Sequence, residues 1–200
     1  REVGAVAEQG SEQRDRGLQV EGSAALPYLL LGMVGIDPHI TLRYGAFEVT
    51  AAGAATVGLA LTAIGLLVMT AIGGLRLLGR LEEVAPGDVG LALVLVSVAT
   101  SRVFSPQYDV WLVAVAVAAA ASAGSRLRPV AIAIMVMSTI TQMLFPWTYG
   151  SLLDCTWFAV VLQTIRLALL WWATVSALAV VVAPDRCEHW PVISRLVRSR

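Results

Sequence analysis

AAGAATVGLALTAIGLLVMTAIGGL, residues 51–75, is the stretch that decides the fold. It carries no charged residue, and about 20 consecutive apolar residues suffice for a helix to cross a bilayer. Gly53, Gly58 and Gly65 predict close packing against a neighbouring helix, because small residues let helix backbones approach one another. Residues 51–75 therefore predict a transmembrane helix that packs within a bundle.

The composition of the whole chain is that of a membrane protein. Of the 200 residues, 58% are hydrophobic and only 14% are charged, whereas soluble domains carry about 25% charged residues. The formal net charge is zero, so no basic field argues for nucleic acid as a partner. The sequence also lacks the spacings of zinc, P-loop or dinucleotide sites. We therefore expect membrane lipids as the surroundings, and neither a metal nor a cofactor.

Further apolar stretches continue the helical pattern after residue 75. They cover about residues 89–104, 106–123, 130–145 and 156–183. The last stretch is long for one helix and contains Arg166, so we expect an interfacial piece up to Gln163 and a span from Arg166 to Val182. The predicted fold class is an all-α integral membrane protein with about five transmembrane helices plus short interfacial helices.

Arginine residues indicate which helix ends face the cytoplasm. They follow the first span and the third span, and they recur in the C-terminal tail, at Arg76, Arg80, Arg126, Arg128, Arg186, Arg195, Arg198 and Arg200. Because basic residues concentrate in cytoplasmic loops, these ends are predicted to lie inside. The chain then divides into an extracytoplasmic segment (1–50), a transmembrane bundle (51–183) and a cytoplasmic basic tail (184–200).

Residues 1–50 are predicted to hold one short helix and a loop. Residues 1–22 are too polar for hydrocarbon, and the apolar piece Ser23–Val34 is too short to span, which predicts a half-buried or interfacial helix. GIDPHITLRYG, residues 35–45, is predicted to be a loop. His39 in this loop has two interpretations, an exposed histidine or a phosphate contact.

RVFSPQYDVW, residues 102–111, carries more hydrogen-bonding groups than a turn between two spans requires. Ser105 is a favoured N-cap residue and Pro106 a favoured first helical residue, so a helix is predicted to begin here. Its first-turn amides, the positive end of its dipole and Arg102 together favour an anion at the level of the lipid headgroups.

Gln107 and Tyr108 would add an amide and a phenol to this anion site. The alternative is a plain helix start followed by an aromatic belt, in which Tyr108 and Trp111 mark the membrane surface. Arg16 and Gln19 lie on the same predicted side of the membrane and favour the phosphate site. A solvated loop with scattered charges is the alternative interpretation of the segment that contains them.

RGLQVE at residues 16–21, YGAFEV at 44–49 and FSPQYDVWL at 104–112 form three ordered elements. Together they resemble the C-terminal half of the family 87 glycosyltransferases, GT-C-type membrane enzymes that include bacterial polyprenyl-phosphate-mannose-dependent mannosyltransferases. Two positions depart from the family pattern. Gly22 replaces a serine, and Asp109 replaces an apolar residue; a carboxylate there would repel a phosphate unless it pairs, for example with Arg102.

The resemblance implies transfer of a sugar, such as mannose, from a polyprenyl-phosphate donor to the hydroxyl of a lipid or glycan acceptor. The reaction would take place on the outer face of a bacterial plasma membrane, in a multi-pass protein with a GT-C-like C-terminal half. Donors fixed around the leaving phosphate would lower the barrier. The resemblance assigns this role to Arg16, Gln19, Arg102, Ser105, Gln107 and Tyr108.

A carboxylate base would deprotonate the acceptor hydroxyl in this reaction. Glu21 is the matched carboxylate, but GT-C enzymes carry their acidic catalytic residue on the first outer loop, so the resemblance implies a base upstream of this chain. Two other functions stay open: a non-catalytic or degenerate membrane subunit that binds lipid phosphate or a partner protein, and a transporter fragment. Transporters hold charges near the membrane midplane, and polar clusters at the outer helix ends argue against transport.

Overall fold

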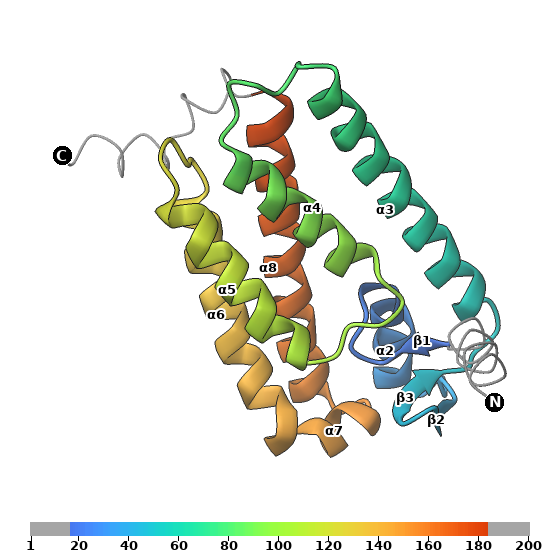
Figure 1. Cartoon of the computed structure of the whole chain (residues 1–200). Helices are drawn as coiled ribbons and strands as arrows, with labels where there is room; N and C mark the ends of the chain where they lie inside the picture. Colours follow the sequence, from blue (N-terminus) through green and yellow to red (C-terminus); the bar gives the residue numbers. More distant parts are fainter. Residues whose placement is uncertain (1–16, 184–200) are drawn as a thin grey trace, which may run out of the picture.

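The computed structural model describes residues 17–183, which fold mostly into helices arranged as one bundle (Figure 1). The long helices are α3 (Ala54–Leu77), α4 (Pro86–Thr100), α5 (Gln107–Ala121), α6 (Arg128–Gln142) and α8 (Trp157–Val182). Three helical segments in this part of the chain are long and apolar enough to cross a membrane, namely α3, Arg128–Trp147 and α8. Helices α4 and α5 are shorter, at 15 residues each. The tail 184–200 and Arg16 lie outside the described residues.

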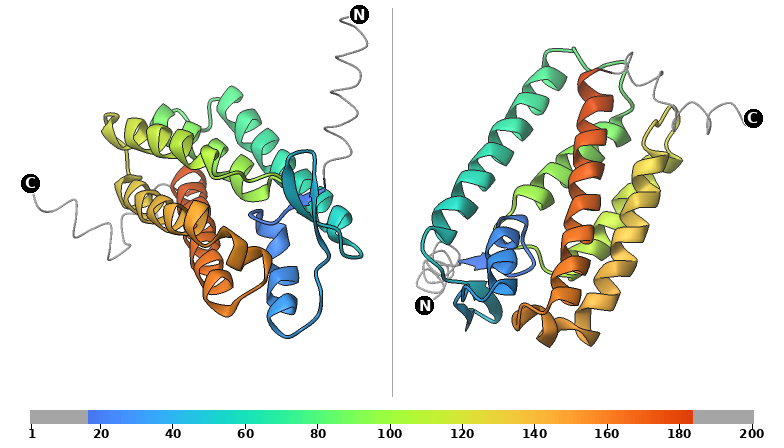
Figure 2. Two further views of the ribbon diagram at one scale, coloured as in Figure 1. Left: turned by 90° about the horizontal axis from the view of Figure 1, so that it is seen from below. Right: turned by 180° about the vertical axis from the view of Figure 1, so that it is seen from behind.

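Helix α8 is the central helix of the bundle. It packs against α4 and α6, and Figure 2 shows it running the length of the molecule with α6 alongside. The prediction that Arg166 divides this stretch into an interfacial piece and a span was wrong, because residues 157–182 form one continuous helix. The helix continues because Arg166 is 1% exposed and has partners inside the bundle.

Helix α3 lies at the edge of the bundle and contacts α4 through glycines. A Cβ atom on Gly65 would lie 1.9 Å from Thr100 Oγ1, and one on Gly58 would lie 3.0 Å from Arg102 Cγ. The predicted close packing against a neighbouring helix is therefore confirmed for Gly65, whereas Gly58 packs against Arg102 in the loop that follows α4. Gly53 instead precedes the helix with a φ of 83°, a left-handed conformation that glycine adopts without strain.

A small antiparallel sheet with strand order β1-β3-β2 lies beside one end of the bundle (Figure 1). Its strands are β1 (Leu18–Gln19), β2 (Ile40–Arg43) and β3 (Ala46–Val49). The prediction of a plain loop over residues 35–45 was wrong, because β2 and β3 form a hairpin. Tyr44 and Gly45 make its turn with φ values of 49° and 75°, as a tight hairpin that matches the strand twist requires. The chain is thus mostly helical with few strands.

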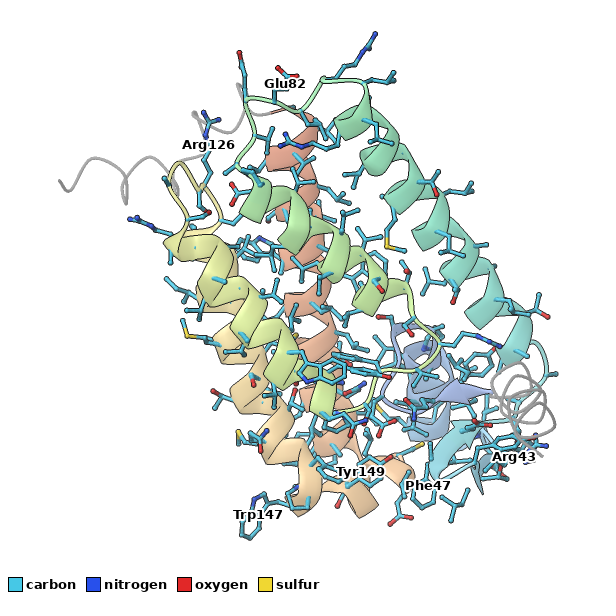
Figure 3. All side chains as sticks on the ribbon, in the orientation of Figure 1. Arg43, Phe47, Glu82, Arg126, Trp147 and Tyr149 are labelled. Atoms are coloured by element: carbon cyan, nitrogen blue, oxygen red, sulfur yellow. The ribbon has the colours of Figure 1, made fainter. Side chains whose placement is uncertain are left out.

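Short helices complete the end of the bundle where the sheet lies. The predicted interfacial helix is present as η1 (Ser23–Ala25) and α2 (Leu26–Met33). Helix α6 is followed by η2 (Met143–Trp147) and α7 (Tyr149–Leu153). Figure 3 shows the two ends of the molecule, with Glu82 and Arg126 at one end and Arg43, Phe47, Trp147 and Tyr149 at the other.

Candidate functional site

Three segments that are far apart in the sequence meet beside the sheet end of the bundle. Strand β1 pairs with β3, with Leu18 opposite Val49 and Gln19 opposite Glu48. The main-chain N–H of Gln19 also donates a hydrogen bond of 3.0 Å to the main-chain carbonyl of Arg102. We call the segments Gly17–Gly22, Tyr44–Val49 and Arg102–Asp109 the motif junction, because each contains all or most of one of the three sequence elements described above.

The structure brings Gln19 and Arg102 together within the motif junction. Gln19 is 6% exposed, and its Oε1 atom has no hydrogen-bond partner in the described part of the chain. Arg102 is half-buried, and its aliphatic stem passes over Gly58 of α3. Ser105 is half-buried and Gln107 is exposed at the start of α5. The junction therefore joins the main chains of Gln19 and Arg102 and leaves the Arg102 side chain partly exposed.

The start of α5 differs from the predicted cap. The helix begins at Gln107, Pro106 occupies the N-cap position, and no side chain caps the first turn. The carbonyl of Ser105 accepts a hydrogen bond of 3.0 Å from the Tyr108 amide. The prediction that Ser105 caps the helix with its hydroxyl was therefore wrong, because the main chain closes this turn.

An apolar groove of about 490 Å³ opens next to the motif junction. Helices α3, α4 and α5 and the loop between α4 and α5 line it, through Met69, Leu93, Val94, Ser97, Val98, Ser101, Val103, Tyr108 and Trp111. Tyr108 packs on Trp111, with ring centroids 5.7 Å apart. Tyr108 therefore contributes to an apolar surface beside Arg102 and is half-buried in it.

A network of buried polar side chains centred on Arg166 lies behind the motif junction. Arg166 Nε donates to Thr141 Oγ1 at 2.8 Å, and Nη1 donates to Gln163 Oε1 at 3.2 Å and to the Glu21 carbonyl at 3.3 Å. The guanidinium also lies over the ring of Phe104, at 4.1 Å from the centroid, a favourable cation–π geometry.

Asp109 provides the charge opposite Arg166. Its Oδ2 atom lies 3.9 Å from Arg166 Nη2, and both side chains are excluded from solvent. Neither carboxylate oxygen has a hydrogen-bond partner among the described residues. The sequence-based suggestion that Asp109 pairs with Arg102 was therefore wrong, because Asp109 faces Arg166.

Glu21 is held inside the protein by its carboxylate and its carbonyl. Tyr149 donates from its phenol to Glu21 Oε1 at 2.7 Å, and Gln163 Nε2 donates to the Glu21 carbonyl at 2.9 Å. Burial raises the pKa of the Glu21 carboxyl, and the hydrogen bond from Tyr149, a main-chain hydrogen bond and the charge of Arg166 oppose this only in part. Burial and the adjacent Glu21 also raise the pKa of Tyr149, which keeps the phenol protonated as a donor.

The space beside Glu21 is too small for a substrate. The cavity lined by Glu21, Tyr149 and Arg166, among others, measures about 10 Å³, which is room for about one water molecule. Glu21 is 8% exposed. In this arrangement its carboxylate supports the fold and does not face an acceptor hydroxyl.

The sequence analysis missed Gln163, Thr141 and Tyr149 as members of this network. One signal was present, because Gln163 and Arg166 are three residues apart in an apolar run and so share one face of a helix. An ionisable residue inside such an apolar run usually pairs with another polar group in the bundle or belongs to a functional site.

Comparison with protein-family models, curated proteins and solved structures finds no match to this chain.

Proposed function

We propose that this chain is the C-terminal membrane portion of a glycosyltransferase that moves a sugar from a polyprenyl-phosphate donor to an acceptor hydroxyl. Mannose is the expected sugar, and a lipid or glycan is the expected acceptor. The observation that carries the proposal is the motif junction, in which the main-chain N–H of Gln19 donates a hydrogen bond to the Arg102 carbonyl at 3.0 Å. A shared ligand site gives a reason for these three separate elements to lie against one another.

The donor phosphate binds at the exposed side of the junction in this proposal. Arg102 supplies the charge and Gln107 an amide donor, and both are accessible at least in part. Negative charge develops on the departing phosphate, so donors fixed before the reaction stabilise the transition state. The apolar groove beside Tyr108 and Trp111 suits the prenyl chain, which would lie in it with the phosphate at Arg102.

The distribution of arginines supports an extracytoplasmic location for the junction. Arg76 and Arg80 lie in the last turn of α3 and just after it, and Arg126 and Arg128 lie just before α6 and at its first residue. Figure 3 shows Arg126 at the end of the molecule opposite Tyr149. Cytoplasmic loops are enriched in arginine. We therefore propose a multi-pass protein of the bacterial plasma membrane whose motif junction faces outward.

The burial of Glu21 favours a second candidate function. This carboxylate accepts a bond from Tyr149 at 2.7 Å and is 8% exposed, so it is poorly placed to deprotonate an acceptor. Under the leading proposal the base is the acidic residue that the family resemblance expects upstream. Under the alternative, the protein is a non-catalytic subunit that binds lipid phosphate without transferring a sugar.

The test is transfer of radiolabelled mannose from polyprenyl-phosphate-mannose in membranes that contain this chain, alone or extended by its upstream coding sequence. We expect transfer in the extended form only. Arg102→Gln should reduce the rate about a hundredfold, as loss of a charge-stabilising donor does in other enzymes. Arg43→Gln is the matched control, because Arg43 is exposed on the hairpin and lies at the same end of the molecule (Figure 3).

Binding of polyprenyl phosphate, with polyprenol for comparison, separates the two candidates. Binding with no transfer in either form supports the non-catalytic subunit. Neither binding nor transfer contradicts both candidates. An equal loss of transfer in Arg102→Gln and Arg43→Gln would show that general surface charge, rather than the motif junction, drives recognition.

A further inference from the structure

Arg166 contacts the first segment of the motif junction through the main chain. Its Nη1 atom donates to the Glu21 carbonyl at 3.3 Å, and Gln163 Nε2 donates to the same carbonyl at 2.9 Å. Glu21 follows Gln19 by two residues, so two donors from α8 fix the chain just after strand β1. The position of Gln19 against the Arg102 carbonyl depends on this anchor.

The same guanidinium contacts the third segment on both sides of the helix start. The Phe104 ring lies 4.1 Å from the guanidinium carbon, and Asp109 Oδ2 lies 3.9 Å from Nη2. Phe104 and Asp109 flank the stretch Ser105–Tyr108, which holds the proposed phosphate contacts. Phe104 and Asp109 are both fully buried, so their contacts to Arg166 set the direction in which α5 begins.

Arginine suits this linking role better than any other side chain. Its planar guanidinium donates in several fixed directions, and here Nε is used by Thr141 and Nη1 by Gln163 and Glu21. An apolar side chain could fill the volume and would avoid the cost of burying a charge. It could not anchor the Glu21 carbonyl.

We infer that Arg166 is a positioning residue for donor binding, which holds the Gln19 and Arg102 segments in the relative placement that binds the phosphate. The inference rests on the proposed function of the motif junction. Arg166 itself is buried behind the junction and does not touch the donor. Its removal should therefore weaken phosphate binding even where the fold is kept.

The double variant Arg166→Met/Asp109→Leu separates positioning from stability. Replacing a buried ion pair by apolar residues of similar volume is often neutral or stabilising, whereas removing one partner is strongly destabilising. The full chain is purified in detergent micelles, and its thermal midpoint and its binding of polyprenyl phosphate are measured. Polyprenol, which lacks the phosphate, reports binding of the prenyl chain alone.

We expect Arg166→Met to lower both the thermal midpoint and phosphate binding. The double variant should regain the midpoint, yet bind polyprenyl phosphate no better than polyprenol. A double variant that regains both properties overturns the inference. Ser176→Ala is the control, because Ser176 is buried on the same helix without a hydrogen-bond partner among the described residues; it should bind as the parent does.

Arg166→Lys gives a second test that does not depend on the folding of the double variant. Lysine keeps the charge opposite Asp109, but its compact ammonium cannot replace the planar fork. We expect binding about tenfold weaker and faster hydrogen exchange of the Gln19 amide. Unchanged binding overturns the inference. A parent chain that binds polyprenyl phosphate no better than polyprenol overturns the proposed function as well, which distinguishes the two failures.

Discussion

Arg166 of α8 and Asp109 of α5 face one another inside the bundle, with Nη2 and Oδ2 3.9 Å apart and side-chain exposures of 1% and 0%. Each side chain compensates the charge of the other in the apolar interior, since an unpaired buried charge is strongly unfavourable. The pair joins the central helix to the helix that begins at the motif junction. The fold and the proposed site therefore share one interaction.

Phe104→Leu should destabilise the protein through this same interaction. The ring is fully buried and lies 4.1 Å from the Arg166 guanidinium, and a desolvated cation–π contact contributes about 2 kcal/mol. The free energy of unfolding in mixed micelles measures the loss. Phe158→Leu is the matched control, because Phe158 is 44% exposed. Equal losses in the two variants would show that the guanidinium contact contributes nothing.

Gly65→Ala should disrupt the contact between α3 and α4. The new methyl group would lie 1.9 Å from Thr100 Oγ1, and overpacking of this kind costs about 1–3 kcal/mol. Gly73→Ala on the same helix is the comparison, because nothing lies within 4 Å of its Cβ position. That variant should be neutral or slightly stabilising, since alanine favours helix by about 1 kcal/mol over glycine. The thermal midpoints of the two variants measure this difference.

Stability should fall as the pH rises through the native pKa of Glu21. Burial raises the pKa of this carboxyl above its ordinary value of 4.5, so above that pH the native state binds more protons than the unfolded state. The stabilising contribution is complete below pH 4.5 and is lost at higher pH.

Glu21→Gln tests this pH dependence because the amide oxygen still accepts from Tyr149. The variant should match the parent in acid and exceed it in thermal midpoint near neutral pH. Glu82→Gln, at an exposed position at the other end of the molecule (Figure 3), is the control and should leave the profile unchanged. A profile of Glu21→Gln that parallels the parent would assign the pH dependence to other groups.

Asp88→Asn should destabilise the end of the bundle opposite the motif junction. Asp88 is 1% exposed and accepts from Ser125 Oγ at 2.6 Å and from the Arg126 amide at 2.9 Å. An asparagine accepts through one atom only and leaves a buried group unpaired, at a cost of about 1–3 kcal/mol.

Phosphate binding distinguishes this variant from those at the junction. Asp88→Asn should lower the free energy of unfolding while polyprenyl-phosphate affinity stays unchanged. Glu83→Gln, at an exposed position in the loop just before α4, should change neither quantity. A loss of affinity in Asp88→Asn would contradict the proposal that polyprenyl phosphate binds at the motif junction.

The helices were predictable because each is a long run of apolar residues. The stretch 51–75 corresponds to α3 at Ala54–Leu77, and the stretch 106–123 corresponds to α5 at Gln107–Ala121. The hairpin was missed although Tyr44-Gly45 lies between two short strands, because an alternating pattern over four residues is weak evidence beside a Pro-containing loop. Hydropathy over long windows is a strong signal, and short strands fall below it.

The sequence by itself determined the helical segments, the polar ends and the presence of one arginine within the last apolar run. Only the tertiary structure decided that Arg166 meets Asp109 and that Gln163 and Tyr149 hold Glu21. The physical reason is that hydropathy depends on composition along the chain. Contacts between α5, α6 and α8 depend on how each helix is rotated and which helices are neighbours, and the packing of the whole bundle sets both.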